Sequence, residues 1–143
     1  MVDFAFVATE RSSENLTVLA EKLTSEDPLV RYWAAQGCLI LGEEARPAAE
    51  GLRQLLNDKY SAVRATAAQT LIGLGEPEKA YEILFNDLRE SENHYVQLNL
   101  LNIYSQLNAL ERIPDEWIKK LRARAGGRYV ERMLDEIAES RGI

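Results

Sequence analysis

Apolar residues recur along this chain at intervals of three and four, which is the spacing of one face of an α-helix. Val30, Ala34, Cys38 and Leu41 form one such stripe, and no segment shows the apolar–polar alternation of a strand. The pattern therefore predicts an all-α fold. The expected helices span residues 3–9, 13–24, 28–41, 46–57, 60–74, 77–90, 93–107, 114–124 and 127–140.

The pattern also repeats with a period of 33 residues, because residues 30–42 are matched by 63–75 and, less closely, by 96–108. A fixed period of this length is typical of a solenoid of stacked helical hairpins. We expect one domain over residues 1–143, a right-handed α-α superhelix of three to four hairpins with a C-terminal capping pair. Its units would cover residues 3–24, 28–57, 60–90 and 93–124, with the cap at 127–141.

Turn-forming residues agree with these boundaries. Gly42, Gly75 and Asn108 hold the same place in the three copies, where a helix should end in a left-handed conformation. Asp27 is expected to cap the helix that starts at Pro28. Three prolines are expected to open the helices that follow the turns: Pro47, Pro77 and Pro114.

Composition narrows the function classes. The 143 residues are 46% hydrophobic and 28% charged, as in an ordinary globular protein, and no apolar run or leader predicts a membrane segment. The net charge is −6, and residues 1–110 carry 9 basic and 16 acidic side chains, which argues against nucleic acid as a partner. Cys38, the single cysteine, is interpreted as a small buried hydrophobic residue.

The strings DPLVRYWAAQGCLILG and YSAVRATAAQTLIGLG resemble HEAT repeats, and the resemblance covers about residues 13–110. The third copy departs from the pattern, with Gln97 in place of arginine and Leu100-Leu101 in place of two alanines. The resemblance implies a non-catalytic scaffold that docks onto a protein, either a separate partner or the enzyme domain of its own parent chain.

Two segments, 25–37 and 113–134, are similar to the C-terminal region of bacterial sulfatases of the N-sulfoglucosamine sulfohydrolase type. In that family catalysis belongs to a separate α/β domain with a C/S-x-P-x-R motif, whereas Cys38 is followed here by Leu39-Ile40-Leu41. This resemblance implies an accessory domain without the enzyme, in the periplasm or outside the cell. Without it, a cytoplasmic location is expected.

Two sets of residues in the first helices are candidate ligand sites. Arg31 and Arg64 occupy equivalent positions and could face an anion such as a sulfated sugar. The alternative, which we favour, is a structural ladder in which each arginine bonds carboxylates or helix-end carbonyls of a neighbouring repeat. Tyr32 and Trp33 could stack on a sugar, but core or inter-repeat packing is the favoured interpretation.

Two further features suggest chemistry less strongly. His94 is the only histidine, too little for a zinc site, and it stands where Ser91 or Asn93 should cap a helix. The C-terminal segment is locally basic, but interleaved acids favour a solvated face of ion pairs over phosphate binding. We expect no catalytic residue, cofactor or metal in this chain. The basic residues of this segment are Lys119, Lys120, Arg122, Arg124, Arg128 and Arg132.

The expected docking surface is formed by the second helix of each hairpin. Its mixed charge suits a protein partner better than a polyanion, and we do not expect a small-molecule ligand. Alternatives are a HEAT-like DNA glycosylase, a bilin lyase, or a carbohydrate-binding module using Arg31, Tyr32 and Trp33. The surface residues are Glu50, Arg53, Gln54, Asn57, Lys79, Glu82, Asn86 and Arg89.

Overall fold

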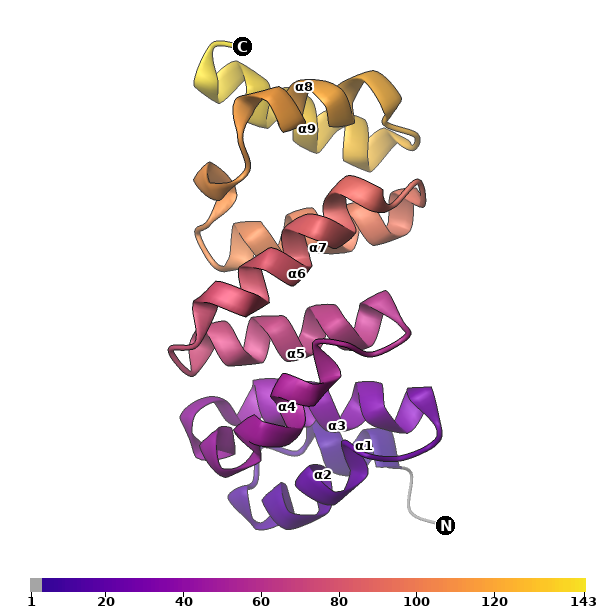
Figure 1. Ribbon diagram of the computed structural model, residues 1–143, viewed down its shortest axis with the longest axis vertical. Coiled ribbons are helices and arrows are strands. Elements are labelled where there is room, and N and C mark those ends of the chain that lie inside the picture. Colours follow the sequence, from indigo (N-terminus) through magenta and orange to yellow (C-terminus); the bar gives the residue numbers. More distant parts are fainter. Residues whose placement is uncertain (1–3) are drawn as a thin grey trace. The chain divides into compact units, whose positions relative to one another are not determined.

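The computed structural model describes residues 4–143, and in that range it contains α-helices and short 3-10 helices but no strand (Figure 1). The predicted all-α class is confirmed. Residue 3, with which the first helix was expected to begin, lies outside the described residues. No helix of residues 4–143 combines the length and the apolar character needed to cross a membrane.

The chain divides into two compact units, which meet between Leu84 and Phe85 inside helix α6 (Pro77–Glu90). The division reflects local packing, and the expected single domain over residues 1–143 stays a prediction.

The first unit consists of helices that pack on their neighbours along the chain, and α3 is at its centre. Helix α3 packs against α1, α2 and α5, and α5 also packs against α4. Its elements are α1 (Phe4–Thr9), η1 (Ser13–Asn15), α2 (Leu16–Lys22), α3 (Pro28–Leu41), η2 (Gly42–Ala48), α4 (Ala49–Leu55), α5 (Ser61–Gly73) and the first half of α6.

Small side chains allow the helices of this unit to approach closely. Ala34, Ala35 and Cys38 of α3 and Ala67 and Ala68 of α5 are all buried without measurable exposure. Close helix packing requires such small side chains at the contact. The small-residue stripes seen in the sequence therefore face the core.

Gly37 marks the tightest of these approaches. A Cβ atom at this position would lie 2.6 Å from Leu19 Cδ2 and 3.1 Å from the carbonyl oxygen of Ala8. A real Cβ cannot occupy that space unless the fully buried Leu19 side chain or one of the two helices moves. The absence of a side chain at Gly37 is thus part of how α3 fits against the two helices before it.

The second unit contains the rest of α6, α7 (His94–Gln106), η3 (Leu110–Arg112), α8 (Asp115–Arg124) and α9 (Arg128–Arg141). Helix α9 packs against both α7 and α8, and its Val130 and Leu134 are buried. Arg141 joins the end of α9 to the loop before α8. Its Nη1 donates to the carbonyl of Ile113 (2.7 Å) and to Asp115 Oδ1 (2.9 Å).

The turns that end the first helices have the expected backbone conformation. Gly42, Gly75 and Asn108 all have positive φ, at 63°, 86° and 50°. Asn108 is the only non-glycine residue with positive φ among residues 4–143, and asparagine tolerates that region better than most residues. The prediction drawn from this series is confirmed.

Two of the three prolines expected to open helices do not do so. Pro47 does not open a helix but lies inside η2, a 3-10 segment that follows α3 directly, and α4 begins only at Ala49. Proline has no N–H to donate, and 3-10 turns are common at helix starts, so the tighter helix accommodates it. Pro114 was expected to be the first residue of its helix but is the N-cap of α8, which begins one residue later at Asp115, whereas Pro77 is the first residue of α6 as expected.

Candidate docking surface

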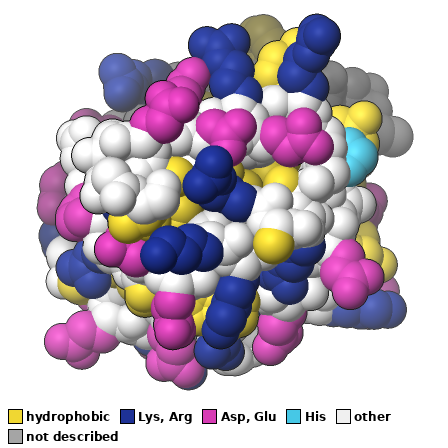
Figure 2. Space-filling model, turned by 90° about the horizontal axis from the view of Figure 1, so that it is seen from above, with side chains coloured by type: hydrophobic (Ala, Val, Ile, Leu, Met, Phe, Trp, Pro, Cys, Tyr) yellow, Lys and Arg dark blue, Asp and Glu magenta, His cyan; other side chains and the backbone are white. Residues whose placement is uncertain are grey.

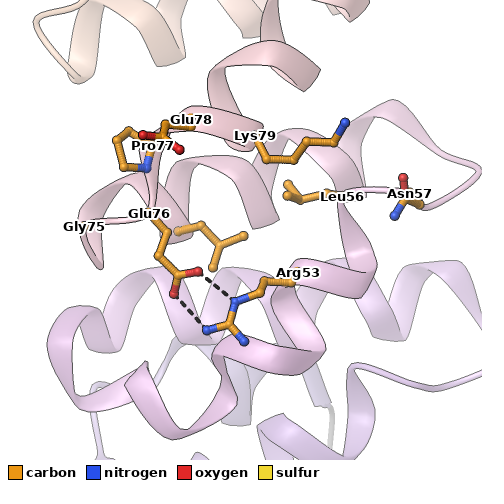
Figure 3. Close-up of a pocket in the computed structure, with 9 residues that line it drawn as sticks. Arg53, Leu56, Asn57, Gly75, Glu76, Pro77, Glu78 and Lys79 are labelled. Atoms are coloured by element: carbon orange, nitrogen blue, oxygen red, sulfur yellow. Dashed lines mark hydrogen bonds and ion pairs between the residues drawn. The ribbon is translucent and has the colours of Figure 1, made fainter.

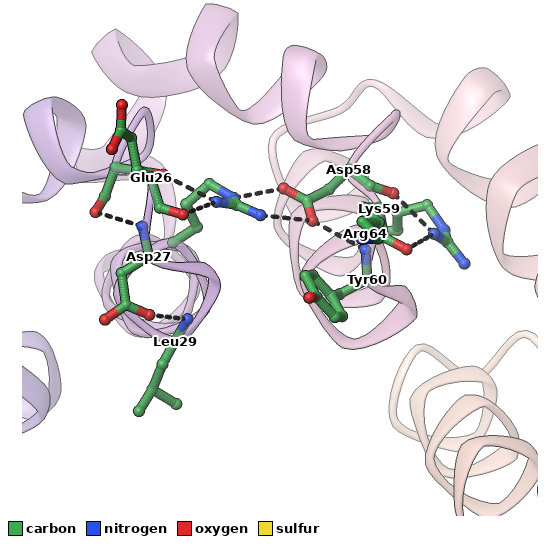
Figure 4. Close-up of polar contacts among 9 residues, drawn as sticks. Glu26, Asp27, Leu29, Asp58, Lys59, Tyr60 and Arg64 are labelled. Carbon is green, nitrogen blue, oxygen red and sulfur yellow. Dashed lines mark hydrogen bonds and ion pairs between the residues drawn. The ribbon is translucent and has the colours of Figure 1, made fainter.

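Arg31, on the first turn of α3, is bonded to protein groups through all three of its nitrogens (Figure 4). Its Nε and Nη2 donate to the two carboxylate oxygens of Asp58, at 2.6 and 3.2 Å. Its Nη1 donates to the carbonyls of Ser25 and Glu26, at 2.9 and 3.1 Å. The guanidinium therefore ties the loop before α3 to the loop before α5.

The same contact recurs at the period of the sequence. Arg64 Nη1 donates to the carbonyls of Asp58 (2.7 Å) and Lys59 (3.0 Å), six and five residues earlier, as Arg31 does in its own loop (Figure 4). Gln97 Nε2 donates to the carbonyl of Ser91 (2.7 Å), again six residues earlier. The third copy has lost the arginine but keeps the loop-closing hydrogen bond.

The partner residue is periodic as well. Ser25, Asp58 and Ser91 are 33 residues apart, and the side chain of each accepts a hydrogen bond from the backbone N–H two residues later. Only Asp58 adds a carboxylate for the arginine of the preceding copy. We call the contacts of Arg31, Arg64 and Gln97 with these loops the loop ladder.

The Arg31–Asp58 pair is well shielded from solvent. The two side chains are 15% and 5% exposed. Burial works to raise the pKa of Asp58, but the hydrogen bonds from Arg31 and from the Tyr60 N–H, with the charges of Arg31 and Arg64, outweigh it and lower the pKa. The hydrogen bond to Asp58 in turn raises the pKa of Arg31. Asp58 thus stays ionised and bonded to Arg31. This contact favours a structural role for Arg31 over binding of an external anion.

Tyr32 and Trp33 lie beside this pair but do not form a flat platform. Their rings meet edge to face, with centroids 5.3 Å apart and planes at 70°, and both side chains are half-buried. Gln36 Nε2 donates to the hydroxyl of Tyr32 and to Thr66 Oγ1 of α5, both at 3.2 Å. This arrangement fits packing between α3 and α5.

A cleft opens on the predicted second-helix surface, at the end of α4 and the start of α6. Its volume is about 400 Å³. Leu56, Leu71 and Pro77 supply apolar walls, and the exposed Asn57 stands at the rim (Figure 3). The remaining lining residues are Arg53, Gly75, Glu76, Glu78 and Lys79. All belong to the first unit, so the cleft needs no contribution from the second.

An ion pair crosses one side of the cleft. Figure 3 shows the Glu76 carboxylate turned toward Arg53, whose Nε and Nη2 donate to it at 2.7 and 3.0 Å. Arg53 Nη1 also donates to Glu50 (2.7 Å). The hydrogen bonds from Arg53 lower the pKa of Glu76, and the two carboxylates raise the pKa of Arg53. The pair links α4 to the turn before α6 and holds that side of the cleft together.

A comparison of the sequence with models of known protein families agrees with this geometry. The family model for HEAT repeats matches residues 16–103, more than half of the chain. The chain belongs to the HEAT-repeat family. Searches of curated proteins and of solved structures gave no match. HEAT repeats are helical scaffolds that commonly mediate protein interactions, and the cleft lies between the second helices of two successive HEAT hairpins.

Arg89, another residue of the predicted HEAT surface, lies in the second unit among aromatic rings. Its Cζ is 5.2 Å from the ring centroid of Phe85 and 5.6 Å from that of Trp117, and its Nη2 donates to Asn86 (2.9 Å). Lys120 Nζ lies 4.5 Å from the Trp117 centroid. Arg89 is half-buried, and its Nε is the one buried side-chain polar atom in residues 4–143 with no hydrogen-bond partner. Its guanidinium thus packs against rings more than it faces solvent.

The basic C-terminal helices of this HEAT chain carry a mixed face. Figure 2, seen from the side of α8 and α9, shows Lys and Arg side chains interleaved with Asp and Glu. Arg122 pairs with Asp135 and Arg132 with Glu136, both at 2.9 Å. These two pairs agree with the ion-paired face expected from the sequence.

The remaining candidate residues are held by local structure. Asn93, not Ser91, caps α7, because its Oδ1 accepts from the N–H groups of Tyr95 and Val96. The ring of His94 lies against that of Tyr95, with centroids 4.1 Å apart and planes tilted by 40°. Cys38 is buried, and burial raises the pKa of its thiol to about 11. Residues 4–143 contain no group of three or more His, Cys, Asp or Glu side chains placed to hold a metal ion.

Sequence reasoning missed Asp58 and Glu76, the carboxylates that join neighbouring HEAT units. Asp58 could have been predicted from the sequence, because Ser25, Asp58 and Ser91 are spaced by the 33-residue period. Glu76 had no such signal. Its partner Arg53 is 23 residues away, and that distance matches no period of the chain.

Proposed function

We propose that this chain is a non-catalytic HEAT-repeat scaffold that docks a partner protein through the cleft between α4 and α6. The observation that carries the proposal is the cleft itself, a hollow of about 400 Å³ with apolar walls on the second-helix surface. Solenoids present their binding surfaces on successive helices of this kind, and protein anchors insert into pockets of this character. HEAT repeats commonly serve protein interactions, which supports the same conclusion.

Several contacts support a role without catalysis. The Cys38 thiol, with a pKa of about 11, carries little of the reactive thiolate at neutral pH. Arg31 is engaged by Asp58 and two carbonyls, so it is not poised for a substrate anion. An assay for glycosylase activity on damaged DNA, and a search for visible absorbance after incubation with bilins, should both be negative.

The test is to fill the cleft without disturbing the helices around it. Asn57→Trp places a large side chain at the rim, and Gln54→Trp places the same side chain on α4 outside the cleft. A partner captured from the native host with the wild-type chain is purified, and its affinity for all three proteins is measured by calorimetry. We expect Asn57→Trp to weaken binding at least tenfold and Gln54→Trp to change it less than twofold. Equal binding by both variants would refute docking through the cleft.

The finer interpretation concerns the parent protein. The similarity of residues 25–37 and 113–134 to sulfatase C-terminal regions supports a role as the accessory domain of a bacterial sulfatase of the N-sulfoglucosamine sulfohydrolase type. In that case the partner is the parent's own catalytic domain, and the location is periplasmic or extracellular. The full open reading frame tests this directly. A C/S-x-P-x-R motif upstream of these repeats supports it, and a reading frame that lacks the motif rejects it.

A further inference from the structure

The charges around the cleft between α4 and α6 define the kind of segment that it fits. Arg53 and Lys79 are the two cations of the lining, and both are occupied by carboxylates. Arg53 is bonded to Glu50 and Glu76, and Lys79 donates to Glu82 Oε1 at 3.1 Å. Four acidic residues thus lie in or beside the cleft against two basic ones: two of the four line the cleft with the two cations, and the other two bond those cations from outside the lining, so the surplus of negative charge belongs to the surroundings of the cleft. These four are Glu50, Glu76, Glu78 and Glu82.

Glu78 is the carboxylate in this set that is available to a partner. It lines the cleft, is exposed, and makes no hydrogen bond or ion pair within residues 4–143. The wider surface has the same sign, because residues 1–84 contain 13 acidic and 8 basic side chains, whereas residues 85–143 contain 10 and 9. The acidic surplus of the chain therefore lies mostly in the unit that holds the cleft.

The walls of the cleft set a second requirement. Leu56 and Leu71 are only 3% and 1% exposed, so they close the bottom of the cleft, and the half-buried Pro77 supplies the apolar surface that a side chain in the cleft can contact. A hollow of about 400 Å³ is large enough for such a side chain and part of its neighbour, since ligand pockets begin at about 300 Å³. An acidic segment would bring its carboxylates against those of the cleft and desolvate both. A purely polar segment would leave the apolar floor without an apolar contact.

We infer that the cleft binds a peptide segment of a partner protein in which an aliphatic side chain stands next to a lysine or arginine. The aliphatic side chain packs against Pro77 over the floor formed by Leu56 and Leu71, and the neighbouring cation meets Glu78 at the rim. This inference rests on the docking function proposed above and adds the chemistry of the partner. Opposite charges across an interface chiefly set specificity and the rate of association, so the cation selects the segment while the apolar contact holds it.

A selection experiment separates the two proposals. A display library of random 12-residue peptides is selected on the wild-type chain, and each clone is then tested on Asn57→Trp and Gln54→Trp. We expect clones that bind the wild type and Gln54→Trp but lose binding to Asn57→Trp, with Leu, Ile, Val or Met beside Lys or Arg. Clones that all ignore Asn57→Trp would refute docking at the cleft. Cleft-dependent clones rich in Asp and Glu, or without an aliphatic residue, would leave docking intact and overturn the inference.

The rim charge is then tested on one synthetic peptide from the selection. Glu78→Lys should weaken its binding about fivefold at low salt, and Glu14→Lys, the same charge change at an exposed site outside the cleft, should change it less than twofold. The difference should vanish in 0.5 M salt because the Debye length falls to a few ångströms. An equal effect of both variants would show that the overall field, and not Glu78, selects the peptide, and would overturn the assignment.

Discussion

Replacing Asp58 by alanine should destabilise the first unit strongly, because the change removes the carboxylate from the loop ladder. The Asp58 side chain is 5% exposed and accepts three hydrogen bonds. Two come from Arg31, and the third comes from the Tyr60 N–H at 3.0 Å. Alanine removes all three and leaves Arg31 without the carboxylate that it bonds, so that only the charge of the more distant Asp27 remains.

The magnitude follows from the burial of the pair. Removing one partner of a fully buried ion pair costs about 3–5 kcal/mol, and a hydrogen bond to a charged group contributes about 1.5–3 kcal/mol. Arg31 is 15% exposed and keeps its bonds to two carbonyls, so part of its guanidinium stays solvated or bonded. We therefore expect Asp58→Ala to lower the free energy of unfolding by about 2–4 kcal/mol, and the Tm by about 10 °C.

The assay is urea denaturation followed by tryptophan emission. Trp33 lies in the first unit and Trp117 in the second, so the measurement is made in a Trp117→Phe background to report the first unit alone. The matched control is Glu43→Ala. Its pair with Arg46 is also bidentate, but the side chains are 67% and 53% exposed, and such pairs contribute about 0–1 kcal/mol. If Asp58→Ala is no more destabilising than Glu43→Ala, the loop ladder does not stabilise the fold.

The pH dependence supplies an independent check of the same contact. The pKa of Asp58 is lower in the folded chain than in the unfolded chain, where an aspartate has a pKa of about 3.9. Its ionised form therefore stabilises the fold above about pH 4, and this contribution is lost as the pH falls through the lower folded value. The difference in stability between wild type and Asp58→Ala should be constant near neutrality and shrink below about pH 4. A difference that stays unchanged at low pH would show that the charge does not matter.

Three further predictions test the packing and the backbone conformation. Gly37→Ala should cost about 1–3 kcal/mol in urea denaturation because its Cβ would meet Leu19, whereas Gly73→Ala, with no atom within 4 Å, should stabilise by about 0.5–1 kcal/mol; similar values would refute the close approach. Native Cys38 should resist iodoacetamide at pH 8 and react fully in urea, and rapid native labelling would contradict its burial. Asn108→Gly should raise the free energy of unfolding by about 0.5–1 kcal/mol, since glycine relieves the positive φ; a loss of stability would argue against that strain.

The sequence predicted well what depends on local spacing. Helix α3 begins at Pro28 with Asp27 as its cap and ends before Gly42, as proposed, because capping and positive φ are properties of a few adjacent residues. Helix α4 was placed too early because its start depends on the 3-10 segment that holds Pro47, a choice between two similar hydrogen-bond patterns. Spacing alone does not separate those patterns.

The site was predicted less completely, because it depends on contacts between hairpins. Arg53 was named as a surface residue, but its bonds to Glu76 appear only when the turn before α6 lies beside α4. Arg89 was expected on the same surface, yet Phe85 and Trp117 draw its guanidinium against their rings. Neither contact can be recognised from the 33-residue period of the sequence. Each joins side chains whose separation along the chain is set by packing and not by the repeat.

The loop ladder has a consequence for how an array of this kind can grow. The segment from Pro28 to Tyr60 contains Arg31, which bonds the loop before it, and Asp58, which that same arginine holds in the loop after it. A tandem duplication of this segment would therefore carry a complete joint with it, and each new junction would begin with its ion pair already encoded. Lengthening the array by whole modules needs no compensating change where two copies join, because every copy keeps its arginine and its carboxylate at the same separation along the chain.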